Sequence, residues 1–183
     1  MKKTVLVPVA DGTEELEAVA IIDVLRRADA GVTVAAVGNN LQITASRGVV
    51  LVADTTIDVC ADKTFDLIAL PGGLPGAEHL RDSVVLTDLL KRQFQENRLL
   101  GAICASPAVV LEFHGLLKGR TATCHPACTD QMRPETYVEQ PVVTDQNCIT
   151  GKGPGVAVDF ALELVARLYG LEKRDAVAGP MCL

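Results

Sequence analysis

The hydrophobic positions of the chain alternate between short unbroken runs and longer stretches with helical spacing. A short apolar run bounded by turn residues predicts a buried strand, and apolar residues three and four apart predict an amphipathic helix. Strand and helix therefore follow one another along most of the chain. The predicted strands are 4–10, 32–37, 66–70, 99–103 and 148–151, and the predicted helices are 14–28, 86–96, a segment starting near Ala105, and 156–169.

Two stretches depart from this alternation. Residues 41–45 and 49–52 are strand-like and flank the turn residues Ser46-Arg47-Gly48, which predicts a hairpin. The stretch from Gly115 to Asn147 is less regular. The short strands expected within it are 121–124 and 142–144.

The alternation of strand and helix predicts an α/β fold with a mostly parallel sheet covered by helices on both faces. No internal repeat, low-complexity tract or linker interrupts the sequence, so we expect one domain over residues 1–183. Hydrophobic residues make up 49% of the chain, whereas aromatic residues make up 3% and Trp is absent. The core is therefore expected to consist of Val, Leu, Ile and Ala.

The net negative charge of the chain argues against nucleic acid as an electrostatically bound partner. The formal net charge is -6, and no run of Lys or Arg forms the positive stripe that binding of a phosphate backbone requires.

The apolar stretch after Lys2 and Lys3 is short and is interrupted by Pro8, so we expect no signal peptide, no membrane span and a cytoplasmic location. The six cysteines are then expected to be mostly reduced thiols.

Three strand-to-helix loops hold candidate chemical groups. The carboxyl ends of parallel strands meet at one edge of a sheet, where functional groups collect. The loops in question follow Val9, Leu70 and Ile103, and they contain Glu14 to Glu17, Gly72-Gly73 and Cys104.

Cys104 is the strongest candidate for a nucleophile. The strand residues before it give way without a spacer to small residues, including Ala105 and Ser106, and to Pro107, which suits the first turn of a helix. This is the layout of a nucleophile elbow, in which the helix N-terminus favours the thiolate over the thiol. The alternative is a buried, inert cysteine, the usual state of a cytoplasmic thiol.

Glu17 is the second candidate. On the predicted helix it shares a face with apolar residues such as Ile21 and Val24 rather than with the polar side. Buried near a thiolate, a carboxyl would have a raised pKa and would donate a hydrogen bond to the sulfur. The alternative is a solvated acid in a first turn that already contains Glu14 and Glu15.

Other residues near these loops support or complicate this picture. The backbone N–H groups of Gly73 and Ala105 could face a developing oxyanion, although plain turn formation explains the glycines equally well. His125 could shuttle protons or be structural. Its flanking Cys124 and Cys128 form one pair of potential zinc ligands without a second pair, so no metal is expected. The segment 151–155 lacks the ending of a phosphate loop and is better explained as a tight turn beside the Cys104 pocket.

Taken in order along the chain, five motifs resemble the ThiJ/PfpI family, and within it the branch of the human parkinsonism-associated deglycase and its bacterial counterparts. The resemblance runs over nearly the whole chain. It implies a flavodoxin-like, doubly wound sheet sandwiched by helices and a small homodimer. The motifs are Asp11-Gly12-Thr13-Glu14-Glu15-Leu16-Glu17, Ser46-Arg47-Gly48, Leu70-Pro71-Gly72-Gly73, Ala102-Ile103-Cys104-Ala105-Ser106-Pro107 and Gly153-Pro154-Gly155.

The resemblance also implies roles for individual residues. Cys104 would be the nucleophile, Glu17 its protonated partner, and His125 a neighbour of the sulfur. The loop residues Gly72 and Gly73, together with Ala105, would bind the substrate oxygen, and Arg47 and Arg27 would frame a pocket at the dimer edge. No cofactor is implied. In the protease-like branch a histidine follows the cysteine directly, whereas this chain has Ala105, which disfavours peptidase activity.

Three functional hypotheses follow. The first is a cysteine-dependent enzyme of deglycase or glyoxalase type, which acts in stress protection on methylglyoxal, glyoxal or their early adducts on protein side chains. The second is a sensor of oxidative stress or a redox-regulated chaperone, in which Cys104 is oxidised to sulfinic acid. The third and weaker hypothesis is a cysteine amidohydrolase or peptidase.

Overall fold

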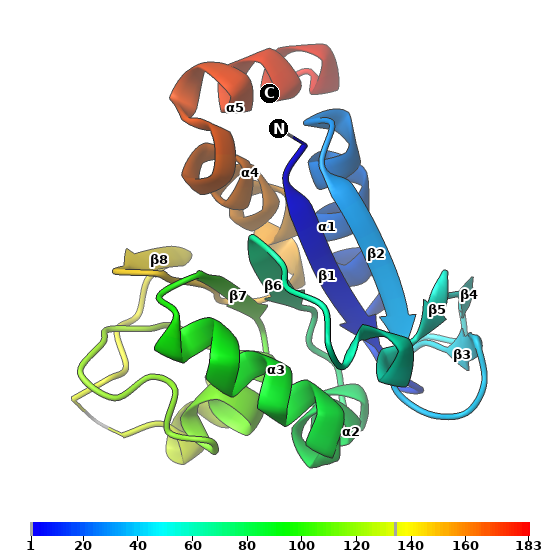
Figure 1. Ribbon diagram of the computed structural model, residues 1–183. Coiled ribbons are helices and arrows are strands. Elements are labelled where there is room, and N and C mark those ends of the chain that lie inside the picture. The colour runs from blue at the N-terminus through cyan, green and yellow to red at the C-terminus, as the bar shows by residue number, and fades with distance from the viewer. Residues whose placement is uncertain (1, 134) are drawn as a thin grey trace.

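The structure is a computed structural model that describes residues 2–133 and 135–183. Its main feature is a seven-stranded sheet with the strand order β5-β2-β1-β6-β7-β9-β8 (Figure 1). All neighbouring strands are parallel except β8 and β9, which are antiparallel. The strands are β1 (Thr4–Val9), β2 (Gly31–Ala36), β5 (Thr55–Thr56), β6 (Leu67–Leu70), β7 (Leu99–Ile103), β8 (Val142–Asp145) and β9 (Cys148–Gly151).

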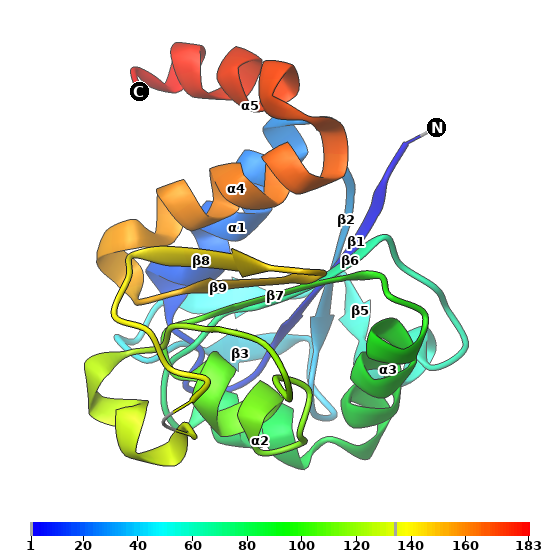
Figure 2. The ribbon, with the colours of Figure 1, turned by 90° about the vertical axis from the view of Figure 1, so that its left-hand side faces the viewer.

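Helices cover both faces of this sheet, as Figure 2 shows. On one face α1 and α4 pack against the strands, and α5 follows α4. On the other face lie α2 and α3, so the two faces carry two separate hydrophobic clusters. The mostly parallel α/β prediction is confirmed. The helices are α1 (Glu15–Arg27), α2 (Gly76–Asp82), α3 (Val84–Gln95), α4 (Ala157–Tyr169) and α5 (Leu171–Ala178).

The central strands are buried because both of their faces meet a helical layer. In β6 and β7 almost every residue is buried, as expected for continuous apolar runs in a parallel sheet. The helix α1 buries the stripe Ile21, Val24 and Leu25 against the same sheet. Within the described residues, no helix is both long enough and apolar enough to cross a bilayer.

The predicted hairpin is present as a separate two-stranded antiparallel sheet of β3 (Gln42–Thr44) and β4 (Val50–Val52). Its tip is attached to the start of α1. The N–H of Ser46 donates to the carbonyl of Thr13, and the Glu15 carboxylate accepts hydrogen bonds from the hydroxyl of Ser46 and the N–H of Arg47. The hairpin therefore extends from the sheet edge where β1 ends.

Two predictions about local structure are wrong. Residues 121–124 do not form a strand: only one bridge, between Ala122 and Tyr137, is present. Side chains take the N–H groups that a neighbouring strand would bind, since Thr121 N donates to Asp145 and Thr123 N donates to the hydroxyl of Thr150.

The segment after Cys104 also differs from the expected α-helix. A π-helical turn covers Pro107–Glu112, with an i to i−5 hydrogen bond from the N–H of Phe113 to the carbonyl of Ala108. Such turns occur often at functional sites. The sequence analysis also missed α2 and α5, which are short.

Candidate active site

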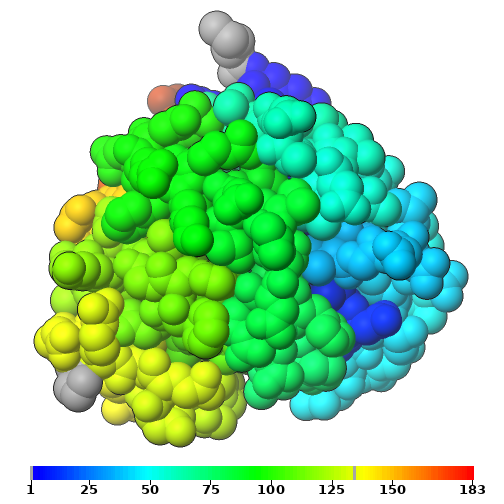
Figure 3. All heavy atoms as spheres, turned by 60° about the horizontal axis from the view of Figure 1, so that its bottom comes forward, coloured from blue at the N-terminus to red at the C-terminus, as the bar shows by residue number. Residues whose placement is uncertain are grey.

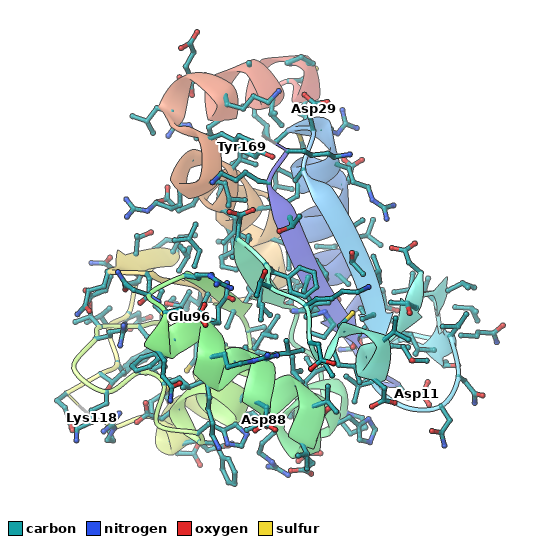
Figure 4. The ribbon with its side chains drawn as sticks, in the orientation of Figure 1. Asp11, Asp29, Asp88, Glu96, Lys118 and Tyr169 are labelled. Carbon is teal, nitrogen blue, oxygen red and sulfur yellow. The ribbon has the colours of Figure 1, made fainter. Side chains whose placement is uncertain are left out.

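Three strand ends bring the predicted site residues to one edge of the sheet. Asp11 follows β1, Gly72 follows β6 and Cys104 follows β7. Figure 4 shows Asp11 at this carboxyl end and Asp29 and Tyr169 at the opposite end of the sheet. The loops predicted to hold the chemistry therefore converge.

The same edge also carries a hollow that is separate from the cysteine. The cavity has a volume of about 470 Å³ and is lined by Asp11, by residues 37–39 before the hairpin, and by residues 82–85 at the junction of α2 and α3 (Figure 3). Val37, His79 and Val84 are among the residues that line it, whereas Cys104 is not. The candidate chemistry lies deeper, under the loop after β6.

Cys104 occupies a strained position on a sharp turn. Its φ is +65°, in the left-handed region that non-glycine residues seldom adopt, and such strain occurs often at active sites. Its N–H donates to the carbonyl of Gly151 at 2.9 Å, and its carbonyl accepts the N–H of His125 at 2.7 Å. Two neighbouring segments thus hold the backbone, and the residue is only 8% exposed.

Glu17 is fully buried beside this thiol. Its Oε2 accepts the N–H of Gly72 at 2.7 Å, and the Glu17 carboxyl and the Cys104 thiol each shift the pKa of the other. Its Oε1 has no hydrogen-bond partner within the described part of the chain. Glu14 caps the helix by accepting the N–H of Glu17 at 2.7 Å, which fixes the first turn of α1.

Burial dominates the electrostatics of the pair. It raises the pKa of Glu17 from 4.5 to about 7, as predicted for a carboxyl on an apolar helix face. It also raises the pKa of the Cys104 thiol, and the charge of Glu17 adds to that rise, while the N–H groups of Gly73 and Ala105 lower it. Desolvation outweighs these backbone donors, so the pKa of the Cys104 thiol lies above its ordinary value. The two groups ionise as a coupled pair.

The glycine loop after β6 fits closely against the cysteine. A Cβ placed on Gly72 would lie 2.7 Å from the Cβ of Cys104, so only glycine allows this approach. The N–H of Gly72 is bound to Glu17, and it is therefore not free for a substrate oxygen. A substrate-binding role for Gly72 stays a prediction. The N–H groups of Gly73 and Ala105 lower the pKa of the thiol, and their role toward a substrate oxygen stays a prediction.

The main chain of His125 lies beside the elbow, because its N–H donates to the carbonyl of Cys104. Its ring is half-buried, and its Nδ1 accepts the N–H of Ala127 at 3.2 Å, which places the ring proton on Nε2 when the imidazole is neutral. With Lys152, Gly153 and Pro154 it lines a cavity of about 220 Å³. The turn 151–155 thus borders His125, and the predicted link to Cys104 is made by Gly151, whose carbonyl accepts the N–H of that residue.

The two predicted arginines lie on different parts of the surface. Arg47 is exposed at the hairpin tip, next to the first turn of α1. Arg27 is exposed near the end of α1 and pairs with Asp23 at 2.7 Å. It lies ten residues after Glu17, about 15 Å along the helix axis. A pocket role for either arginine stays a prediction.

Glu15 has a structural role that the sequence did not indicate. It is 8% exposed and binds the hairpin tip, and these hydrogen bonds hold its pKa below the usual range despite partial burial. An acidic first turn is too common to reveal such a contact. The signal lies in tertiary structure, where the turn with Arg47 meets α1.

The remaining cysteines have no comparable surroundings. Cys124 and Cys148 are buried, and burial raises the pKa of each to about 12. Cys182 is exposed near the C-terminal end. Over the ranges 2–133 and 135–183, no group of three or more His, Cys, Asp or Glu side chains is arranged to hold a metal ion.

The fold and site together define a doubly wound α/β protein centred on a cysteine, with a buried carboxyl and two backbone donors at the sulfur. Comparison with known proteins agrees with this class. The chain belongs to the DJ-1/PfpI family, whose sequence model matches residues 3–167.

Similar proteins come from plants, animals and protozoa. "Protein DJ-1 homolog B" of Arabidopsis thaliana is 53% identical over 169 residues, which are 92% of this chain and 39% of that protein. The chain therefore spans about two fifths of that plant relative. "Glutathione-independent glyoxalase DJR-1.2" of Caenorhabditis elegans is 38% identical over 98% of this chain and 95% of its own. The solved structure "Toxoplasma gondii DJ-1, oxidized" has a TM-score of 0.97 and 46% identity over 98% of both chains.

Proposed function

We propose that this protein is a cofactor-independent, cysteine-dependent enzyme that converts reactive dicarbonyls such as methylglyoxal or glyoxal to hydroxy acids. Early adducts of these compounds on protein side chains are a second class of substrate for the same reaction. The observation that carries the proposal is the buried Glu17 carboxyl, with a pKa of about 7, beside the Cys104 thiol.

The first step is addition to the aldehyde. As the pair loses its first proton, the remaining proton is shared between Glu17 and Cys104, and the thiolate form attacks the aldehyde carbon. A C–S bond forms, and the carbonyl oxygen becomes an alkoxide. The N–H groups of Gly73 and Ala105, which lower the pKa of the thiol, stabilise this alkoxide, and protonated Glu17 supplies the proton that converts it to a hemithioacetal.

The second step moves hydrogen within the substrate. Ionised Glu17 removes the proton from the former aldehyde carbon, and an enediol forms. Return of a proton to the neighbouring carbon gives a 2-hydroxy thioester, with no external oxidant. Water then cleaves the thioester and restores the thiol, so that methylglyoxal and one water become lactate. His125, whose N–H donates to the carbonyl of Cys104, is the residue that would activate that water.

Two further observations support this assignment. The Caenorhabditis elegans relative bears the name of a glutathione-independent glyoxalase and aligns over nearly its whole length. The buried Glu17 carboxyl and the Cys104 thiol also provide the base and the nucleophile that this reaction needs. A substrate with a reactive aldehyde suits a thiol that is nearly buried, because only a small group reaches it.

Turnover of methylglyoxal tests the proposal. Lactate would be measured with the wild type, Cys104→Ala, Glu17→Gln and the control Cys182→Ala, which changes an exposed thiol. We expect at least a hundredfold loss for Cys104→Ala and Glu17→Gln, and unchanged turnover for the control. Equal rates for wild type and Cys104→Ala would reject the proposal.

A redox sensor is the second candidate function. The unpartnered Oε1 of Glu17 supports it, because a protonated carboxyl could donate that hydrogen to an oxygen on the sulfur. A similar protein from Toxoplasma gondii is described as oxidised. Mass spectrometry after mild peroxide treatment separates the two functions. Two added oxygens confined to Cys104 support a sensor, while scattered oxidation of all six cysteines contradicts it.

A homodimer forms part of the proposal. Several apolar side chains of α1 and of the β3–β4 hairpin are about half exposed or more, and a second copy would bury them. These residues are Leu16, Val19, Val49, Val50 and Val52. Light scattering of wild type and Val50→Lys tests this, and a wild-type mass of one chain would contradict it.

Peptidase activity is disfavoured, since Ala105 follows the cysteine at the position where the protease-like branch of the family has a histidine.

A further inference from the structure

Ser106 makes an unusual hydrogen bond two residues after the cysteine. Its side chain is fully buried, and its Oγ donates to the carbonyl of Pro71 at 2.6 Å. A serine near a helix start commonly bonds to the local backbone. Here the hydroxyl instead joins the elbow after β7 to the loop after β6, two segments that both contact the thiol.

The carbonyl of Pro71 needs this donor. Proline has no N–H, so the carbonyl is the one main-chain hydrogen-bonding group of a buried residue at the end of the β6 ladder. A buried carbonyl without a donor is costly, and loops shift to avoid that state. Ser106 therefore fixes the point at which the loop leaves the sheet.

The loop that begins at Pro71 carries the groups that meet the reacting pair. The N–H of Gly72 holds the Glu17 carboxyl, and the carbonyl of Gly72 accepts the N–H of Glu14 at 2.9 Å. The N–H of Gly73 lowers the pKa of the Cys104 thiol. Two consecutive glycines restrict the backbone weakly, and Gly73 has a φ of +89°. The position of these donors depends on what anchors the loop.

We propose that Ser106 is a positioning residue, whose hydroxyl holds the Pro71–Gly73 loop against the Cys104 elbow and so sets how the backbone donors and the Glu17 carboxyl meet the sulfur. It touches neither substrate nor the reacting atoms. Its effect on turnover rests on the proposed dicarbonyl chemistry, whereas its effect on the thiol does not.

The test compares Ser106→Ala with Thr87→Ala in the full chain. Thr87 matches it as a control, because its hydroxyl also donates to a main-chain carbonyl, that of Arg81, in a part of the molecule without site residues. Alkylation of Cys104 by iodoacetamide would be followed by mass spectrometry across pH, with exposed Cys182 as the reference thiol in the same molecule. The kcat and KM for methylglyoxal and the thermal midpoint would be measured in parallel.

For Ser106→Ala we expect the alkylation profile of Cys104 to move to higher pH, because the donors to the sulfur weaken. We also expect kcat to fall about tenfold while KM changes less than about threefold, since displaced oxyanion donors act on the transition state. Thr87→Ala and the Cys182 reference should leave the profile and kcat unchanged.

Two results separate failure of this inference from failure of the proposed function. If Ser106→Ala lowers only the thermal midpoint, and the Cys104 profile and kcat match wild type, the hydroxyl is merely structural and the inference is overturned. If wild type makes no lactate, the dicarbonyl proposal fails, and the alkylation profile alone then supports or overturns the role of Ser106.

Discussion

Replacing Glu17 with glutamine should make the protein more stable at alkaline pH. The buried carboxyl has a pKa of about 7 in the folded chain and about 4.5 when exposed. The folded chain therefore binds this proton more tightly than the unfolded chain does, and the wild type loses stability as pH rises from about 4.5 through about 7. Glutamine stays neutral and can still accept the N–H of Gly72.

The size of the effect follows from the two pKa values. Each pKa unit corresponds to about 1.4 kcal/mol, so the free energy of unfolding should differ between variant and wild type by about 3 kcal/mol more at pH 8 than at pH 4.5. Denaturant unfolding at fixed protein concentration measures this difference. Glu172→Gln, which removes an exposed carboxyl on α5, is the control and should give parallel curves.

A small difference would refute the reasoning. If the unfolding free energies of wild type and Glu17→Gln ran parallel to within about 1 kcal/mol between pH 5 and pH 8, then burial would not hold a proton on Glu17. The basis for the coupled pair with Cys104 would be lost at the same time.

Three further predictions concern the same edge of the sheet. Lactate formation should rise with pH through about 7 as the Glu17–Cys104 pair loses its first proton, and a flat pH–rate profile would contradict this. Gly72→Ala should destabilise the fold by about 1–3 kcal/mol and lower turnover at least tenfold, because the new Cβ meets Cys104, and wild-type values in both assays would argue against such close contact. Glu15→Ala should cost about 1–3 kcal/mol and speed tryptic cleavage at Arg47, since the hairpin tip loses its carboxylate, while unchanged cleavage would show that other contacts hold the tip.

Local patterns were sufficient to predict most of the fold. Continuous apolar runs identified the central strands because both faces of those strands are buried, and helical spacing identified α1 together with the inward position of Glu17. Residues 121–124 misled the prediction because their main-chain partners are the side chains of Asp145 and Thr150. Such partners lie more than twenty residues away, and no local pattern reveals them.

The sequence indicated which residues form the candidate site, but not how desolvation and hydrogen bonding set the pKa of the thiol. The turn around Cys104 and the periodicity of Glu17 follow from neighbouring residues. The ionisation of the thiol depends on how much water the loop after β6 excludes, and the bond from Ser106 to Pro71 depends on the pairing of β6 with β7. These properties arise only when the strands assemble.

The close contacts of the glycine loop constrain how this protein could acquire new substrates. A side chain at Gly72 or Gly73 would collide with neighbouring backbone or with Cys104, so few substitutions are tolerated in this loop. The exposed hairpin tip at Arg47 and the cavity beside His125 and Lys152 have no such limit. Libraries for directed evolution of the proposed enzyme would therefore be built on these two segments, and divergence in its substrate range is expected to accumulate there.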